Sequence, residues 1–109
     1  MTAIGNDCGF EQVFEKQVEA LARPGDIAVG ITTSGNSPNV LRAVEYANEH
    51  GMRTFGVCGY DGGALKRAAQ QSLHVRCDDM GLVEAVHGVV FHYLVDALRE
   101  AFAALAESQ

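Results

Sequence analysis

The pattern of hydrophobic and polar positions predicts helices and strands that alternate along the first half of the chain. Residues 10–21 carry apolar side chains at helical spacing with charged residues opposite, which predicts a helix. The Arg-Pro-Gly-Asp sequence at 23–26 ends it. The apolar run at 26–31 is too short for a helix and rich in β-branched residues, which indicates a buried strand. A helix at about 38–50 follows, and Gly51 is suited to cap its C-terminus.

The same alternation continues to the C-terminus. Residues 53–58 are predicted to form a second strand, 64–71 a short helix and 73–76 a third strand. A long final helix at about 82–106 is capped by the polar turn before it. Strands that alternate with helices pair in parallel through right-handed crossovers, so the predicted fold is α/β, a three-layer αβα sandwich with a parallel sheet of about three strands. At 109 residues the chain, 1–109, is expected to be a single domain.

A turn of small hydroxyl residues joins the first strand to the next helix. Thr32, Thr33, Ser34 and Ser37 place four hydroxyls within six residues. Hydroxyl donors beside the free N–H groups and positive dipole end of a helix form the kind of site that holds a phosphate. Ser37 before Pro38 is equally an ordinary N-cap, so both interpretations stay open. No Lys follows the glycine of the turn, which favours a phosphorylated small molecule over a nucleoside triphosphate.

Composition and charge narrow the classes of partner. The chain is 48% hydrophobic and 20% charged, as is typical of a soluble globular protein. Its formal net charge of -6 disfavours nucleic acid and anionic membranes as partners. Cys8, Cys58 and Cys77 show neither disulfide nor zinc-knuckle spacing, and a reducing cytoplasm is the expected compartment. No uninterrupted apolar run approaches the ~20 residues of a membrane span.

Several motifs together resemble one family. Thr-Thr-Ser-Gly-Asn-Ser-Pro-Asn-Val at 32–40 resembles the Ser-Thr-Ser-Gly-Asn-Ser segment of sugar isomerase (SIS) domains, and within them of phosphoheptose isomerases. Ala-Ile-Gly-Asn-Asp at 3–7, Val-Phe-Glu-Lys-Gln-Val at 13–18, the turn at 23–26 and Gly-Tyr-Asp-Gly-Gly at 59–63 fit the same subfamily in the same order. The resemblance implies an aldose-ketose isomerase that acts on D-sedoheptulose 7-phosphate. The family's usual chain begins with a further helix, a strand and a Gly-Asn-Gly-Gly-Ser phosphate loop, to which nothing here corresponds.

The resemblance also implies roles for individual residues. The hydroxyl turn would hold the sugar phosphate, and Asn6 and Asp7 match an Asn-Asp pair that contacts the sugar. In the family pattern Gln-Glu-x-His-x-x-x-x-His, the second His is a metal ligand and acid/base group, and it falls on His92. The Gln, a ligand of metal and substrate, falls on Glu84, while the following Glu is replaced by Ala85. The implied metal is Zn²⁺, with Glu84 and His92 as ligands.

The predicted final helix restricts how its polar residues can act. On a helical wheel its apolar residues form one broad face, with His87 near the middle and Glu84 and His92 at the margins. His87 is therefore expected to be a hydrogen-bonded core histidine. Glu84 and His92 lie ~12 Å apart along the axis and ~80° apart around it. One straight helix can barely bring both onto one Zn²⁺, and completion by a neighbouring subunit is the simpler geometry.

The thin sheet predicts association. In the family, the missing strands would lie beside the strand at 26–31, and their absence would leave an open edge and an uncovered apolar face. We therefore expect a homo-oligomer, either a dimer or a tetramer. Two further functions stay open beside the isomerase. One is a non-catalytic SIS module that senses a phosphosugar or binds proteins, and the other is a truncated, inactive isomerase.

Overall fold

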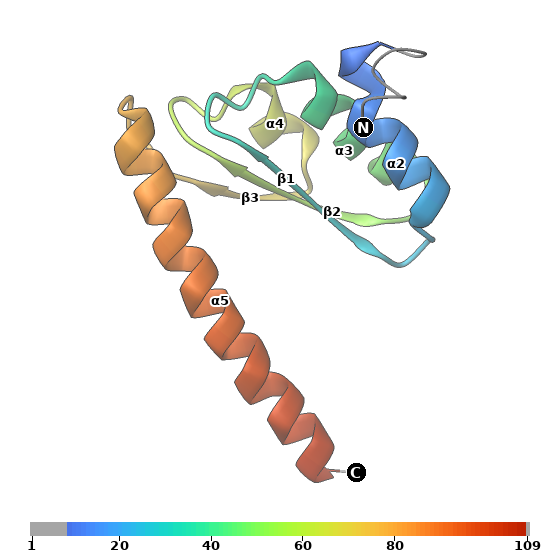
Figure 1. The fold of residues 1–109 in the computed structure, drawn as a ribbon, viewed down its shortest axis with the longest axis vertical. Helices are drawn as coiled ribbons and strands as arrows, with labels where there is room; N and C mark the ends of the chain where they lie inside the picture. Colours follow the sequence, from blue (N-terminus) through green and yellow to red (C-terminus); the bar gives the residue numbers. More distant parts are fainter. Residues whose placement is uncertain (1–8, 109) are drawn as a thin grey trace.

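The computed structural model describes residues 9–108, in which helices and strands alternate (Figure 1). The three strands form one sheet in the order β1-β2-β3, and both pairs are parallel. The predicted α/β class and parallel three-stranded sheet are confirmed. The elements in order are η1 (Phe10–Gln12, a 3-10 helix), α2 (Val13–Leu21), β1 (Ile27–Thr32), α3 (Pro38–Glu49), β2 (Arg53–Cys58), α4 (Gly63–Ala68), β3 (Gln71–His74) and α5 (Met80–Ser108).

Helices α2, α3 and α4 lie on one face of the sheet and enclose the core (Figure 1). The buried cluster is formed by Val44, Cys58, Leu65 and Ala69. Gly30 allows α3 to approach β1 closely, because a Cβ there would lie 2.9 Å from the side chains of both Val40 and Val44. The core therefore holds the carboxyl end of β1 against the start of α3.

Helix α5 lies on the other side of the sheet and forms only the beginning of a third layer. Its first turns pack on the loop after β2, where Val83 is fully buried. The rest of the helix leads away from the sheet (Figure 1). The predicted apolar stripe is present, but Leu94, Leu98, Phe102 and Leu105 on it are exposed. The third layer of the predicted sandwich is thus open in this chain.

The turns and caps at three element ends agree with the predictions. In the turn before β1, the backbone N–H of Arg23 donates to Asp26 Oδ2 at 2.9 Å. Gly51 follows α3 in the left-handed region, with φ 78°. Asp79 caps α5, since its Oδ1 accepts a hydrogen bond from the N–H of Leu82 at 3.2 Å. Local sequence determines these three sites.

The predicted bounds of the third strand and of the helix before it are wrong. Helix α4 ends at Ala68 rather than 71, and β3 spans Gln71–His74 rather than 73–76. The cause is Thr54, a fully buried residue of β2. Its hydroxyl accepts a hydrogen bond from the N–H of Gln70 at 3.0 Å, which draws the chain out of the helix and into the sheet early. A contact across 16 positions of sequence is invisible to a periodicity argument.

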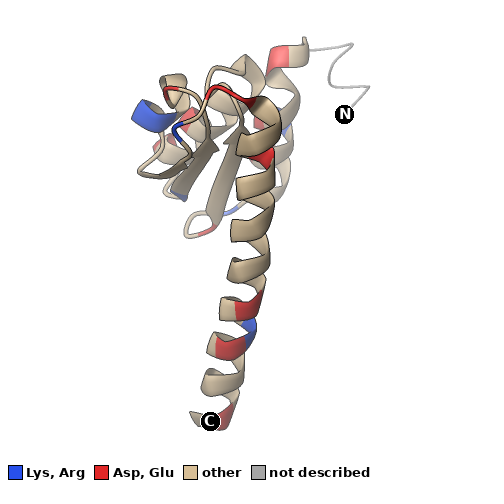
Figure 2. Ribbon diagram, turned by 90° about the vertical axis from the view of Figure 1, so that its left-hand side faces the viewer, with Lys and Arg blue, Asp and Glu red and all other residues tan. Residues whose placement is uncertain are grey.

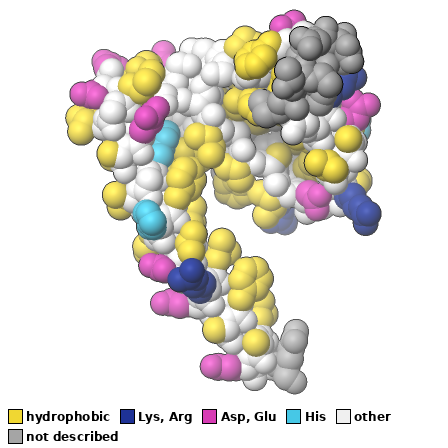
Figure 3. Space-filling view, in the orientation of Figure 1, with side chains coloured by type: hydrophobic (Ala, Val, Ile, Leu, Met, Phe, Trp, Pro, Cys, Tyr) yellow, Lys and Arg dark blue, Asp and Glu magenta, His cyan; other side chains and the backbone are white. Residues whose placement is uncertain are grey.

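The hydropathy of α5 bears on the expectation that no apolar run in the chain approaches the length of a membrane span. By length and composition alone, this helix is long and apolar enough to cross a membrane. Its charged residues are Glu84 near the start and a group in the C-terminal half (Figure 2). A single such helix is weak evidence of a membrane span, because the core helix of a globular protein has the same composition. The uncovered apolar face of the sheet lies across from the apolar stripe of α5 (Figure 3).

Candidate functional site

The hydroxyl turn lies at the carboxyl end of β1, where ligands of open parallel sheets commonly bind. Three of its four hydroxyls converge. Thr32 Oγ1 lies 2.7 Å from Ser37 Oγ and 3.5 Å from Ser34 Oγ. Ser34 Oγ also accepts a hydrogen bond from the N–H of Asn36 at 3.1 Å. Thr33 instead contributes its backbone, because its carbonyl accepts from the N–H of Gly59 at 2.8 Å.

The N-cap interpretation describes the position of Ser37 but not the use of its hydroxyl. Ser37 is the N-cap of α3 and Pro38 is its first residue, yet the Ser37 side chain makes no cap hydrogen bond. The hydroxyl faces Thr32 instead. The start of this 12-residue helix is therefore not closed by its own N-cap side chain. Hydroxyls and a helix N-terminus lie together, which is what a phosphate site requires.

Glycines hold the turn against the neighbouring loop. Gly35 has φ 76°, and a Cβ on it would collide with the carbonyl oxygen of Gly62. The Gly35 carbonyl accepts from the N–H of Leu65 at 2.8 Å, and Asn36 Oδ1 accepts from the N–H of Ala64 at 3.0 Å. These hydrogen bonds from the backbone of α4, together with the close approach of Gly35 to Gly62, fix the shape of the turn.

The two residues expected to bind metal, one of which is also the expected acid/base group, both lie on α5. Glu84 and His92 are both exposed. Within residues 9–108, no group of three His, Cys, Asp or Glu side chains could hold a metal ion. Two ligands on one helix do not complete the four-coordinate shell of Zn²⁺, so this donor set alone does not fit a zinc site. Asn6 and Asp7 lie outside the described residues.

His87 and Cys58 belong to the packing beneath α5. His87 is 4% exposed, and its Nε2 lies 3.0 Å from the carbonyl oxygen of Cys58. It is the hydrogen-bonded core histidine that the wheel predicts. Burial raises the pKa of the Cys58 thiol, against a smaller lowering by the charge of Lys66. A thiol with a raised pKa is a poor nucleophile at neutral pH, so Cys58 is a structural residue.

Sequence reasoning missed a polar hollow of about 420 Å³ at the carboxyl ends of β2 and β3. His74 is its most constrained member. Its Nε2 donates to the carbonyl oxygen of Tyr60 at 2.8 Å, and its Nδ1 accepts from Lys66 Nζ at 3.1 Å. The only available signal was that His74 is a polar residue within the predicted strand at 73–76. The lining residues are Tyr60, Asp61, Lys66, His74, Arg76, Cys77 and Asp78.

Comparison with known proteins identifies the family. Residues 1–59 match the family model of the SIS domain. The chain belongs to the SIS domain family. The phosphoheptose isomerase of Geotalea daltonii is 49% identical over 92% of this chain and 52% of its own length. That of Helicobacter pylori is 45% identical over 94% of this chain and 54% of its own length.

Solved structures of phosphoheptose isomerases share the fold of this SIS domain. The enzyme from Neisseria gonorrhoeae superposes with a TM-score of 0.88 and 41% identity, covering 91% of this chain and 55% of that one. The enzyme from Francisella tularensis gives 0.83 and 41%, covering 87% and 51%. The resemblance to phosphoheptose isomerases that the motifs indicate is confirmed. The chain spans about half the length of the curated relatives it matches.

Proposed function

We propose that this SIS domain binds a sugar phosphate and forms part of a phosphoheptose isomerase, which converts the ketose D-sedoheptulose 7-phosphate to an aldose, heptose 7-phosphate. The relatives named phosphoheptose isomerase support this substrate over the alternative of a non-catalytic sensing module. The observation that carries the proposal is the convergence of the Thr32, Ser34 and Ser37 hydroxyls at the start of α3.

The convergence is chemically suited to a phosphate. Each hydroxyl can rotate its proton from a neighbouring hydroxyl to a phosphate oxygen, and the helix start adds backbone donors and partial positive charge. The turn at 32–40 contains no Asp or Glu, so no side chain of the turn repels the anion despite the net charge of -6. Thr32 is 7% exposed, which keeps its hydroxyl partly shielded from water and strengthens its bond to a charged ligand.

Calorimetric titration of the chain with sedoheptulose 7-phosphate tests this site. We expect the double variant Ser34→Ala/Ser37→Ala to bind at least ~10-fold more weakly, because hydrogen bonds to charged groups contribute about 1.5–3 kcal/mol each. Ser108→Ala, at the far end of α5, is the matched control and should bind like the unaltered chain. Unchanged affinity in the double variant would reduce the turn to a helix start without a ligand.

We propose His92 as the acid/base residue. Isomerisation moves a proton between adjacent carbons and needs a group to carry it. His92 is exposed near the middle of α5 and free to reach a partner surface. Glu84 would contact the substrate or a metal, and its charge, in place of an amide, would hold a cation more tightly and disfavour the phosphate. The partner group for His92 lies outside residues 9–108 in this proposal.

We further propose a homo-oligomer, dimer or tetramer, that works in the cytoplasm. The proposed oligomer is supported by the run of exposed apolar side chains along α5, because burying them against another subunit would remove them from water. A Zn²⁺ site is proposed only for the completed protein, with Glu84 and His92 as the ligands that this chain would contribute and the others from elsewhere. A neighbouring subunit would remove the need for one helix to bring both side chains to one ion.

A further inference from the structure

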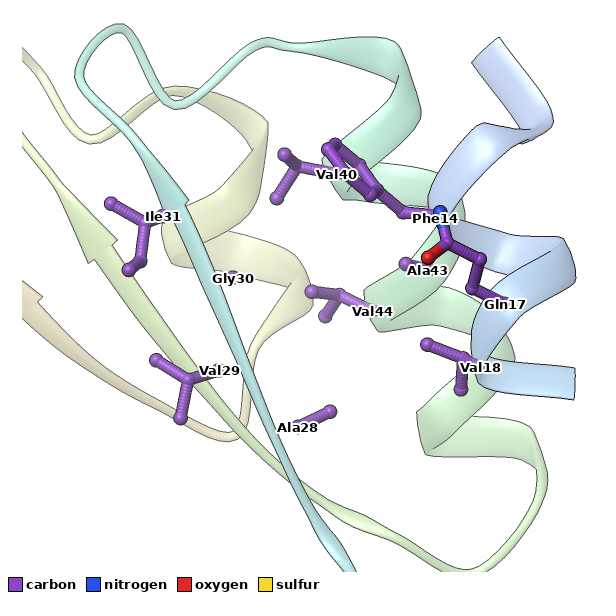
Figure 4. Close-up of a pocket in the computed structure, with 10 residues that line it drawn as sticks. All are labelled: Phe14, Gln17, Val18, Ala28, Val29, Gly30, Ile31, Val40, Ala43 and Val44. Atoms are coloured by element: carbon purple, nitrogen blue, oxygen red, sulfur yellow. The ribbon is translucent and has the colours of Figure 1, made fainter. Parts of the chain in front are cut away.

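The polar hollow of about 420 Å³ at the carboxyl ends of β2 and β3 has no role in the proposed function. It shares no lining residue with the hydroxyl turn or with α5. Two cations, two carboxylates and a histidine are among its seven lining residues. A groove of about 360 Å³ between β1 and the helices α2 and α3 is instead lined mainly by apolar side chains, such as those of Phe14, Val18 and Val44 (Figure 4). Ligand sites commonly have volumes of about 300–1,000 Å³, so the polar hollow can hold a small, charged ligand.

Lys66 is held in place at this hollow although the residue is exposed. Its Nζ donates to His74 Nδ1 at 3.1 Å, and His74 Nε2 donates to the carbonyl oxygen of Tyr60 at 2.8 Å. Because an ammonium can only donate and a carbonyl can only accept, these partners define the neutral tautomer of His74. Lys66 has three N–H donors and His74 takes one of them. Restraining a long side chain before a ligand arrives lowers the entropy that is lost on binding.

Backbone hydrogen bonds fix the segment that carries Arg76, the second cation of the hollow. The N–H of Val75 donates to the carbonyl oxygen of Cys58 at 3.1 Å, and the N–H of Tyr60 donates to that of Cys77 at 3.0 Å. These two bonds join the segments that follow β2 and β3 on either side of Arg76. The walls of the hollow are therefore formed by the chain itself and do not depend on a ligand.

The two cations are not neutralised by the carboxylates beside them. Within residues 9–108, neither Lys66 nor Arg76 forms an ion pair. Asp61 uses its Oδ1 to accept a hydrogen bond from the N–H of Gly63 at 2.9 Å, so it is engaged by its own loop. Phosphate suits such a pair of cations, because Arg can bind it through two parallel hydrogen bonds and Lys as a point charge.

We propose that the polar hollow is a second ligand site, which binds the phosphate monoester of a small sugar or other polyol. Lys66 and Arg76 hold the phosphate, and Asp78 accepts hydrogen bonds from hydroxyls. The carboxylates repel a second phosphate, which excludes di- and triphosphate chains. A metal ion is not the ligand, because both nitrogens of His74 are engaged and residues 9–108 contain no group of three metal-binding side chains. The proposal rests neither on isomerase activity nor on the hydroxyl turn.

Nuclear magnetic resonance of the His74 ring tests the proposal, because this ring contacts Lys66. We expect titration of the full chain with ribose 5-phosphate, at constant ionic strength, to shift the ring signals of His74 until they saturate. Ribose, which lacks the phosphate, should leave the signals unchanged. Inorganic phosphate should bind at least ~10-fold more weakly than ribose 5-phosphate, because it lacks the sugar hydroxyls that donate to Asp78.

Variants that remove one positive charge locate the contact. Lys66→Gln and Arg76→Gln should each weaken the binding of ribose 5-phosphate at least ~10-fold. Arg67→Gln removes the same charge from the next residue of α4, which does not line the hollow, and should bind like the unaltered chain. All three residues are exposed, so the variants should fold normally, and circular dichroism checks this.

Three results would overturn the proposal. They are His74 signals that do not saturate, equal affinity for ribose 5-phosphate and inorganic phosphate, and a loss in Arg67→Gln as large as that in Lys66→Gln, which would show only a general attraction of anions. The double variant Ser34→Ala/Ser37→Ala should leave the affinity read at His74 unchanged, and a loss there would also contradict a separate site. Binding at His74 without binding at the hydroxyl turn would support this proposal and contradict the proposed function, so the two claims fail separately.

Discussion

At the residue scale, the shape of the hydroxyl turn depends on Gly35. We expect Gly35→Ala to lower the free energy of unfolding by at least ~2 kcal/mol more than Gly25→Ala. Both glycines have positive φ, 76° and 93°, so both alanines pay for a left-handed backbone. Only at Gly35 would the new Cβ meet a backbone oxygen, whereas nothing lies within 4 Å of a Cβ at Gly25. Urea unfolding followed by circular dichroism measures both, and equal losses would show that the two loops are not locked together.

Single residues also show what the sequence can and cannot predict. The composition of the turn indicates an anion site, because hydroxyls, a glycine and a helix start are local features. The Ser37 hydroxyl faces Thr32 rather than its own helix. This orientation depends on the path of the chain across five residues. The role of Gly62 as the neighbour of Gly35 depends on a contact between two separate loops. The sequence therefore predicts the kind of site, but not which residues contact Ser37 and Gly35.

At the scale of elements, α5 carries a glycine without an evident packing role in this chain. A Cβ at Gly88 would meet nothing within 4 Å. We therefore expect Gly88→Ala to raise the free energy of unfolding by up to ~1 kcal/mol, the difference in helix propensity between the two residues. Thermal unfolding measures the gain, and Gly81→Ala in the first turn, where propensity counts less, is the control.

The contrary outcome for Gly88→Ala would be informative. A loss of stability in the oligomer would show that another backbone packs against α5 at Gly88. The long helix and its stripe were predictable from periodicity, and its cap from the polar turn that precedes it. Its divergence from the sheet was not, because periodicity gives the apolar face and not the element that covers it.

At the scale of the whole molecule, exposed apolar surface predicts association. Light scattering at micromolar concentration should give the mass of a dimer or tetramer. The double variant Leu98→Glu/Phe102→Glu should shift the protein toward monomer without unfolding the sheet domain, since both side chains are more than half exposed. A sharp monomer peak for the unaltered chain would contradict the proposed homo-oligomer.

The arrangement of the whole molecule could be predicted from the sequence only in part. The parallel three-stranded sheet and the open edge at β1 followed from the order of elements and from the family resemblance. The groove between β1 and α2 did not, because its volume depends on where α2 settles against α3. The candidate site is likewise divided, with a preformed turn on one side and Glu84 and His92 exposed on α5.

The isomerase activity of the chain, alone and completed, tests the central claim most directly. A general acid or base contributes ~10²- to 10⁴-fold, so the 109-residue chain without a partner group for His92 should be nearly inactive on sedoheptulose 7-phosphate. Addition of the uncovered half of a phosphoheptose isomerase should restore turnover, and His92→Ala should abolish it again. Conversion by the chain alone at ~1 per second or faster would contradict the account, and Glu84 would then be the first candidate for the partner group.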